Sequence, residues 1–578
     1  MNIDYLVIAG YFCLIVAISL VFKKMASNST SDYFRGGGKM LWWMVGGTAF
    51  MTQFSAWTFT GAAGKAFTDG LSVIAVFVGN MMAYVFAYFY FAKRFRQMRV
   101  DTPTEAVGRR FGSGNEQFFT WVIIPLSVIN AGVWLNGLSV FASAVFDADI
   151  TMTIYVTGIS VLVVSLLSGA WGVVASDFVQ MLVVAVISIA CAIVGLVVVG
   201  GPGEIIEKFP GGFISGPDMN YPLILICTFL FFVVKQLQSI NNMQESYRFL
   251  NAKDSKNASK AAIFALVLML VGTVIWFIPP WVTAIIYPDA AQAYPELGKK
   301  ASDAVYLVFA RNVMPVGTVG LLMAGLFAAT MSSMDSALNR NSGVFVRSFY
   351  APIIRKNNAD DKELLRVGQI VCIVNGILVI LMAQFFNSLK HLSLFDLMMQ
   401  VATLLQSPIL VPLCFGMIIR KTPKWAPWAT VLVGMCVSWA VVNIFTPNYV
   451  AGWFGIEELT KREISELKVI ITIAAHLFFT AGFFCLTTFF YKEEKDDNKA
   501  RRIAFFNDVD TECVAREGQD EIDRAQRKKL STLVMIMSAG LCAMVLIPNP
   551  LWGRILFAGC ALAIFAVGYG LKRSAEIK

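Results

Sequence analysis

Residues 325–350, GLFAATMSSMDSALNRNSGVFVRSFY, begin as an apolar helix that suits a bilayer and then place hydroxyl groups and a carboxylate within the same helix. Ala329, Ser332, Ser333 and Ser336 are spaced i, i+3, i+4 and i+7, so they share one helix face. Oxygen ligands on one face suit a hard cation such as Na⁺. Small residues and serines also let membrane helices pack closely, so a packing role stays open for the serines.

Asp335 lies one position off that face. A carboxylate within a bilayer is costly unless it is paired or bound to a cation, which argues against a purely packing role for the helix. The alternative is a hydrated aspartate at the cytoplasmic mouth of the protein.

The composition indicates an all-α polytopic membrane protein. Of 578 residues, 57% are hydrophobic and 15% are charged, which is unlike a soluble enzyme. Apolar runs of ~20 residues, long enough to cross a bilayer core, recur along the whole chain. We expect about fifteen transmembrane helices, near residues 4–22, 41–65, 71–92, 117–145, 151–169, 173–199, 221–243, 260–286, 310–346, 366–386, 393–419, 426–446, 467–491, 530–547 and 551–571.

Basic residues recur in alternate connections between these spans, at Lys93, Arg94, Arg96, Arg99, Arg109 and Arg110, at Arg248, Lys253, Lys256 and Lys260, at Arg355, Lys356, Lys362 and Arg366, and at Arg420, Lys421 and Lys424. Cytoplasmic loops of membrane proteins carry such an excess of Lys and Arg. An odd number of spans then places the amino terminus outside and the carboxyl terminus in the cytoplasm. We expect a multi-pass protein of the plasma membrane, of the bacterial inner membrane type.

Several classes of protein are disfavoured. The net charge of +9 is divided among short loops, so the bilayer is an expected partner and nucleic acid is not. The ten cysteines are scattered without a CxxC pair, which argues against a disulfide framework or a zinc site. Because no catalytic constellation or phosphate-binding loop is recognisable, we do not expect an enzyme.

Residues 31–64, SDYFRGGGKMLWWMVGGTAFMTQFSAWTFTGAAG, resemble the start of the sodium:solute symporter family, which includes sodium-coupled sugar, proline and sialic acid transporters. Residues 169–180, GAWGVVASDFVQ, are similar to a second family motif, and the A-x-x-S-S helix at Ala329 to a third. The resemblance extends over residues 5–446. It implies a LeuT-like core of two five-helix halves in inverted topology, each beginning with a broken helix, with extra peripheral helices.

The expected organisation follows from the resemblance and the span positions. We expect an extra N-terminal transmembrane helix in 1–30, the first half of the repeat in 31–200 and the second half in 201–420. Peripheral transmembrane helices then occupy 421–491, a charged cytoplasmic segment 492–529, and C-terminal transmembrane helices 530–578.

The resemblance also implies where Na⁺ binds. A principal site takes the backbone carbonyls of Met51, Phe54 and Ala329 and the hydroxyls of Ser332 and Ser333. Sialic-acid-type members have a second sodium site, and here it corresponds to Asp177, Asp335 and Ser336, with a carboxylate in place of one serine. Na⁺ is thus expected as a coupling ion.

The candidate substrate-binding residues are Gln53, Thr58, Lys235, Gln238, Asn242, Asp396, Met399 and Gln400. In sugar-transporting members an aromatic gate stands at the position of Gln238 and a glutamine at that of Met399, so the hexose pattern is broken twice.

Lys235 is the most informative of these residues. It stands ~14 residues into a span, about two-thirds of the way across at 1.5 Å per residue, where a lysine should face protein or a cavity. A substrate carboxylate would be a natural partner. The alternatives are that the side chain extends to the cytoplasm or pairs with an acidic residue such as Asp396.

We therefore expect sodium-driven symport of a small polar solute by alternating access, with a sugar or a uronate-like sugar acid as the substrate, in a monomer or weak homodimer. A neutral sugar, an amino acid or another small carboxylate is the alternative substrate. A transporter-like sensor and a passive channel are less favoured function classes.

Overall fold

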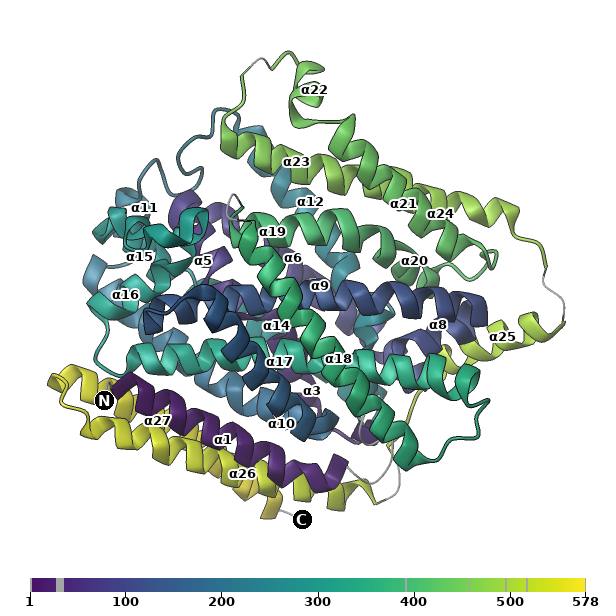
Figure 1. The fold of residues 1–578 in the computed structure, drawn as a ribbon, viewed down its shortest axis with the longest axis horizontal. Coiled ribbons are helices and arrows are strands. Elements are labelled where there is room, and N and C mark those ends of the chain that lie inside the picture. Colours follow the sequence, from purple (N-terminus) through teal and green to yellow (C-terminus); the bar gives the residue numbers. More distant parts are fainter. Residues whose placement is uncertain are drawn as a thin grey trace.

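The computed structural model describes residues 3–26, 36–389, 392–456, 458–493, 496–515 and 518–576. These residues form helices joined by turns, and an isolated β-bridge between Met40 and Ala252 is the one β pairing among them. The predicted boundary near residues 30 and 31 lies outside the described residues. In Figure 1 the helices lie side by side as a bundle, with α15 and α16 at the left and α8 and α25 at the right.

Twelve stretches of the described residues are long and apolar enough to cross a membrane. The three other expected spans have clear counterparts. Ile3–Ile18 and Ile150–Leu166 are shorter apolar helices. The third is the broken helix expected near residues 41–65. Its outer part belongs to the stretch Ala56–Gln97, within which the chain turns at Gly70 (φ 64°).

The first part of the chain forms α1 (Ile3–Ala26), α3 (Trp42–Gln53), α4 (Ala56–Phe59), α5 (Gly61–Asp69), α6 (Ile74–Phe86), η3 (Ala87–Phe91), α7 (Ala92–Gln97), α8 (Pro103–Phe111), α9 (Ser113–Phe146), α10 (Ile150–Val199) and α11 (Pro202–Lys208). The second part forms α12 (Pro222–Ile240), α13 (Tyr247–Leu250), α14 (Ser255–Ile275), α15 (Ile278–Ile286), η6 (Pro295–Ala304), α16 (Val305–Val313), α17 (Thr318–Val344), η7 (Phe345–Ile354), α18 (Asp361–Ser388), α19 (Leu394–Gln400), η8 (Val401–Gln406) and α20 (Ser407–Ile418).

The remaining helices are α21 (Ala426–Asn443), α22 (Pro447–Gly452), α23 (Lys461–Ala475), η9 (His476–Ala481), α24 (Gly482–Leu486), α25 (Asp496–Asp510), α26 (Gln519–Ala543) and α27 (Leu551–Glu576). In Figure 1, α26 and α27 lie beside α1 along one edge of the bundle, and α21 and α23 lie along another edge. The charged segment after α24 contains the helix α25.

The element α10 contains two arms that run in opposite directions. Arg311 donates to the carbonyl of Ala144 just before α10, while Gly195 near the end of α10 packs against Phe309. A straight helix of 50 residues would be about 75 Å long, so both ends could not lie beside α16. The chain therefore crosses the bundle twice within α10, as the two expected spans 151–169 and 173–199 require.

Two helices are interrupted, one at the start of each predicted half. Helix α3 ends at Gln53 and the chain resumes as α4 at Ala56. Helix α12 ends at Ile240, and the chain becomes helical again at α13 after a non-helical turn. Met40 bonds to Asn251 and Lys253, so the first broken helix begins where the second one ends. The two predicted helix interruptions are therefore present.

The basic end of the bundle is the end where the cationic connections gather. Arg94, Arg109 and Arg420 all lie there, and they form ion pairs with Asp508 or Asp510 of α25. Basic connections that are far apart in sequence therefore lie at the same end of the bundle. This agrees with the recurrence of basic residues in alternate connections.

Candidate functional site

The break between α3 and α4 exposes backbone groups in the middle of the protein. Phe54 (φ −105°, ψ 119°) and Ser55 (φ −137°, ψ 178°) have extended conformations that end α3. The last carbonyls of a helix have no intrahelical partner, so the final turn of α3 offers oxygen atoms to a ligand. The Ser55 hydroxyl instead accepts a hydrogen bond from the Trp57 amide and begins α4.

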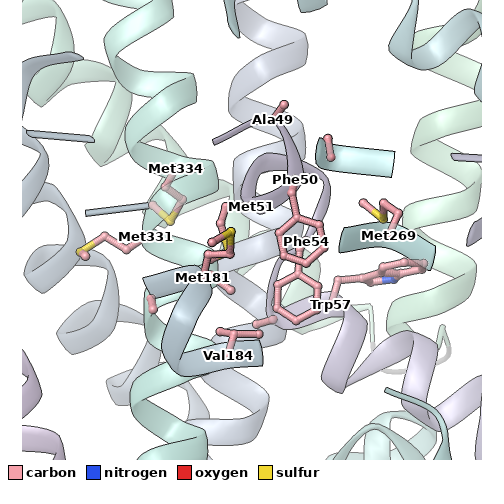
Figure 2. Close-up of a cluster of buried hydrophobic side chains, with 14 of the residues drawn as sticks. Ala49, Phe50, Met51, Phe54, Trp57, Met181, Val184, Met269, Met331 and Met334 are labelled. Carbon is pink, nitrogen blue, oxygen red and sulfur yellow. The ribbon is translucent and has the colours of Figure 1, made fainter. Parts of the chain in front are cut away.

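The side chains of Met51 and Phe54 pack into the hydrophobic core, which leaves only their carbonyls for binding. Figure 2 shows Met51 on the side of Met181, Met331 and Met334, and Phe54 beside Phe50. Phe54 also packs on Trp276, with ring centroids 4.6 Å apart. Buried apolar side chains of this kind hold the broken backbone in place.

Helix α17 lies against the break. The Ala56 amide donates to the Thr330 hydroxyl at 3.2 Å, which brings the segment around Ser332 and Ser333 to the end of α3. The Ser333 hydroxyl donates to the Ala329 carbonyl at 3.2 Å. The buried Ser332 hydroxyl has no hydrogen-bond partner among the described residues. Buried polar groups are normally satisfied, so this oxygen is available to a ligand.

Two buried carboxyl groups lie next to the serines of α17. Asp177 of α10 accepts a hydrogen bond from Thr48, and Asp335 of α17 accepts one from Ser165. The other oxygen of each carboxyl, Oδ1 of Asp177 and Oδ2 of Asp335, has no partner in the described part of the chain. Ser336 is buried beside Asp335. The alternative for Asp335 was a hydrated side chain at the cytoplasmic mouth of the protein. The residue is only 1% exposed, which argues against that alternative.

These oxygen atoms have the chemistry that a small hard cation requires. Released carbonyls and hydroxyls meet at the helix break, and unpartnered carboxyl oxygens lie in the adjoining helices. The residues predicted for the two sodium sites are thus gathered around α3, α10 and α17.

A cavity lies between the two broken helices. It is lined by residues of α3, α4, α6, α9, α12, α13, α17, α19, η8 and α20. Three predicted substrate residues are among them, Gln53, Lys235 and Met399. Lys235 is 7% exposed, and its ammonium donates to the Gln236 side chain at 3.1 Å. Gln236 in turn donates to Asn80 at 2.7 Å. In the described residues no ion pair joins Lys235 to Asp396, so the predicted pairing alternative is not seen.

The other five predicted substrate residues are not part of the cavity lining. Gln238 donates to the Ser407 carbonyl, and the Asn242 side chain bonds the backbone at the break after α12. Asp396 accepts hydrogen bonds from Ser393 and from Ser465 of α23. The remaining two residues are Thr58, which is buried, and Gln400, which is partly buried.

Three charged residues of the cavity were missed as site residues by the sequence reasoning. Glu245 pairs with Arg248 at 2.5 Å and lies 3.9 Å from Arg340 of α17. With its amide oxygen facing Arg248, Gln53 accepts from that guanidinium at 3.2 and 3.3 Å. Arg248 was assigned to a cytoplasmic loop because it begins a run of basic residues, but it is buried against the cavity. The polar run Gln244–Ser246 after an apolar span was the signal available.

Several other polar and aromatic side chains line the cavity, although the sequence did not predict them as site residues. They are Thr52, Trp57, Asn80, Asn130, Trp134, Gln236, Ser239, Gln244 and Gln406. At the end away from the basic loops, the Trp57 indole donates to the Leu394 carbonyl at 3.3 Å and stacks on Phe395. These contacts close the cavity toward that end.

Comparisons with known proteins agree with this arrangement. The chain is 24% identical over 477 residues to the sodium/myo-inositol cotransporter 2 of Sus scrofa, covering 75% of this chain and 68% of that protein. It is 23% identical over 454 residues to the sodium/sialic acid symporter NanT of Aliivibrio fischeri, covering 76% and 87%. The sodium/glucose cotransporter of Vibrio parahaemolyticus is 25% identical over 448 residues, covering 73% and 81%.

Among solved structures, a substrate-bound outward-open state of a Na⁺-coupled sialic acid symporter has a TM-score of 0.61 and 20% sequence identity. The match covers 83% of this chain and 98% of that chain, and it shows that the two proteins share the LeuT-type fold.

The sequence profile named "Sodium:solute symporter family" matches residues 33–434, which is more than half of the chain. Transport in this family is coupled to Na⁺, which is a cotransported ion rather than a cofactor. The protein belongs to the sodium:solute symporter family, and it is a multi-pass membrane transporter of small solutes rather than an enzyme.

Proposed function

We propose that this symporter imports a small polar solute that carries a carboxylate, a sugar acid of the uronate type, together with Na⁺. The observation that carries the proposal is the charge of the cavity. Lys235, Arg248 and Arg340 provide three cations, and Glu245 provides one carboxylate among the described lining residues. Two positive charges are therefore left over, and buried charges require partners.

The lining favours a hydroxylated solute. Amide side chains at Gln53, Asn80 and Asn130 and the Ser239 hydroxyl offer both donors and acceptors toward the cavity. Trp57 and Trp134 supply flat apolar surfaces, which suit a sugar ring. The names of the similar proteins, which refer to inositol, glucose and sialic acid, agree with a polyhydroxylated substrate.

We assign the Na⁺ sites by the same reasoning. The principal site takes the carbonyls of Met51, Phe54 and Ala329 with the hydroxyls of Ser332 and Ser333. A second site is formed by Asp177, Asp335 and Ser336. The unpartnered oxygens of Ser332, Asp177 and Asp335 support both assignments.

The orientation and organisation belong to the same proposal. The basic end faces the cytoplasm, so the amino terminus is outside and the carboxyl terminus inside a plasma membrane. Residues 31–200 and 201–420 form the two inverted halves. The hydrogen bonds of Met40 to Asn251 and Lys253, which join the start of the first broken helix to the end of the second, support the inversion.

The test is counterflow in proteoliposomes loaded with unlabelled solutes. Vesicles preloaded with a uronate should accumulate the labelled uronate in Na⁺ buffer and not in choline buffer. A neutral sugar, an amino acid and an aliphatic carboxylate serve as matched solutes. Equal counterflow of the uronate and its parent neutral sugar would refute the carboxylate assignment. Equal accumulation in choline would refute Na⁺ coupling.

A further inference from the structure

A groove outside the transport cavity lies at the basic end of the bundle. It runs between η3 and α7 on one side and α14 on the other, and the end of α25 forms its third wall. Its charged lining residues are Lys93, Arg94, Lys256, Lys260, Asp510 and Glu512.

The four cations of this groove outnumber its two carboxylates, Asp510 and Glu512. Asp510 pairs with Arg420 at 2.8 Å and lies 3.8 Å from Arg94. In the described part of the chain no ion pair involves Lys93, Lys256 or Lys260, and all three side chains are exposed. Because these lysines come from two helices and converge on one groove, they create a local positive potential that attracts an anion.

The third wall of the groove is held in place by the backbone. The Ser255 amide donates to the Cys513 carbonyl at 3.0 Å, and the Cys513 amide donates to the Ser255 hydroxyl at 2.9 Å. This pair of bonds fixes the segment after α25 to the start of α14. The hydroxyls of Ser259 and Tyr88 also line the groove, and they add hydrogen-bonding groups beside the lysines.

The groove leads into apolar surface on both helices. Lys256, Lys260, Ile263 and Val267 are spaced i, i+4, i+7 and i+11, so they share one face of α14. Val267 is 51% exposed, and Phe89 of η3, one turn before Lys93, is 69% exposed. Exposed apolar side chains on a transmembrane helix face acyl chains, which places the lysines at the level of the lipid headgroups.

We propose that this groove binds the headgroup of an anionic phospholipid. The phosphodiester lies among Lys93, Lys256 and Lys260, and the acyl chains follow the apolar surface of Phe89, Ile263 and Val267. Basic pockets between transmembrane helices are suited to anionic headgroups. A free phosphate would use the lysines alone, whereas a lipid uses the lysines and the apolar surface together.

The experiment measures lipid retention by the full-length protein. The protein is placed in nanodiscs of phosphatidylcholine with a rising fraction of phosphatidylglycerol, and retained lipids are counted by native mass spectrometry. The triple variant Lys93→Gln, Lys256→Gln, Lys260→Gln should lose phosphatidylglycerol retention several-fold. The matched control Lys356→Gln, Lys362→Gln, Arg366→Gln removes the same charge from exposed positions elsewhere. It should retain phosphatidylglycerol like the wild type.

Two further measurements distinguish a lipid from a soluble phosphate and control for a folding defect in the triple variant. Glycerol phosphate and inorganic phosphate are added in solution, and neither should displace phosphatidylglycerol. If either does so fully, the groove is a soluble phosphate site and the lipid assignment is wrong. The single variant Lys260→Gln should give a smaller loss in the same direction if the triple variant does not fold. Equal losses in the groove variants and the control, or no loss in either, would overturn the proposal.

Discussion

The ammonium of Lys65 on α5 lies 2.7 Å from the carboxylate of Glu466 on α23, and both side chains are largely buried. A second ion pair runs beside it, because Arg462 of α23 lies 3.1 Å from Asp69 of α5. Ser465 of the same helix donates to Asp396 at 3.1 Å. Helix α23 is therefore bonded both to α5, the outer part of the first broken helix, and to the start of α19. The Trp57 indole contacts the same end of α19, at Leu394 and Phe395.

Breaking this buried pair should destabilise the protein in a non-additive way. We expect Lys65→Met to cost about 3–5 kcal/mol, because it leaves the buried Glu466 carboxylate without its cation. Glu466→Gln should cost less, because the Lys65 ammonium also pairs with Asp69. The double variant should lose less than the sum of the two. Thermal unfolding in detergent checks this in a double-mutant cycle.

The exposed pair Lys208–Glu204, 2.6 Å apart, is the matched control. Solvent screens an exposed ion pair, so Lys208→Met and Glu204→Gln should have small and additive effects. Additive losses at Lys65 and Glu466 would show that the buried pair is not coupled.

Ser332→Ala and Ser333→Ala should weaken Na⁺ binding. We expect the Na⁺ concentration for half-maximal uptake to rise about tenfold, which corresponds to about 1.4 kcal/mol, because each variant removes one oxygen ligand. Ser342→Ala is the control, since Ser342 lies on the same helix and its hydroxyl is bonded to the Leu338 carbonyl. An unchanged Na⁺ dependence in both site variants would rule out the principal site.

Asp335→Asn should reduce the cooperativity of Na⁺ activation. Two buried carboxyl groups repel unless a cation separates them, so loss of one charge removes the second ion. We expect a Hill coefficient above one in the wild type and close to one in the variant, measured by uptake over a range of Na⁺ concentrations. Asp520→Asn, on the exposed first turn of α26, should leave the coefficient unchanged. If Asp335→Asn also leaves it unchanged, Asp335 is not a ligand.

Lys235→Met should change the preference between an acid and its neutral analogue. Removing one partner of a desolvated charge pair costs about 2–5 kcal/mol, so the acid should lose affinity and the neutral analogue should gain relative to it. Competition against labelled substrate in proteoliposomes gives both affinities. Lys356→Met, at an exposed position, is the control. An unchanged preference would make Lys235 structural and return the substrate to an unspecified neutral solute.

Asp303, in the turn between α15 and α16, should make stability depend on pH. The pKa of Asp303 is raised to about 7, chiefly by burial and also by the Asp396 carboxylate, against the lowering effects of the Leu394 amide and the Lys300 ammonium. Since the folded-state pKa lies above the unfolded value near 4, the stabilising contribution is complete below about pH 4. It is lost as the pH rises through about 7.

We therefore expect the unfolding temperature of the wild type to fall between about pH 4 and 7 more steeply than that of Asp303→Asn. Differential scanning fluorimetry in detergent checks the two curves. Parallel curves would show that Asp303 does not titrate in this range.

Much of the architecture could be predicted because it depends on short-range properties of the chain. Apolar runs determine where helices cross a bilayer, and the family resemblance of residues 31–64 implied the interruption that appears at Phe54. The spacing of Ala329, Ser332 and Ser333 placed them on one face whatever surrounds them. Lys235 was also recognised from its depth within a span.

The composition of the cavity could not be predicted in this way. Glu245 and Arg248 follow an apolar span and look like the start of a cytoplasmic loop, yet the interruption after α12 turns them back against Arg340 of α17. Asp396 has the acidic character expected of a substrate residue, but it bonds to Ser465, far away in sequence.

The sequence by itself determined the membrane class and which residues of α17 share one helix face, because hydropathy and helix period act over a few residues. The tertiary structure alone decided which charges meet, such as Lys65 with Glu466 and Arg340 with Glu245. The physical reason is that a charge finds its partner by the packing of whole helices, and residues hundreds of positions apart carry no local signal of their contact.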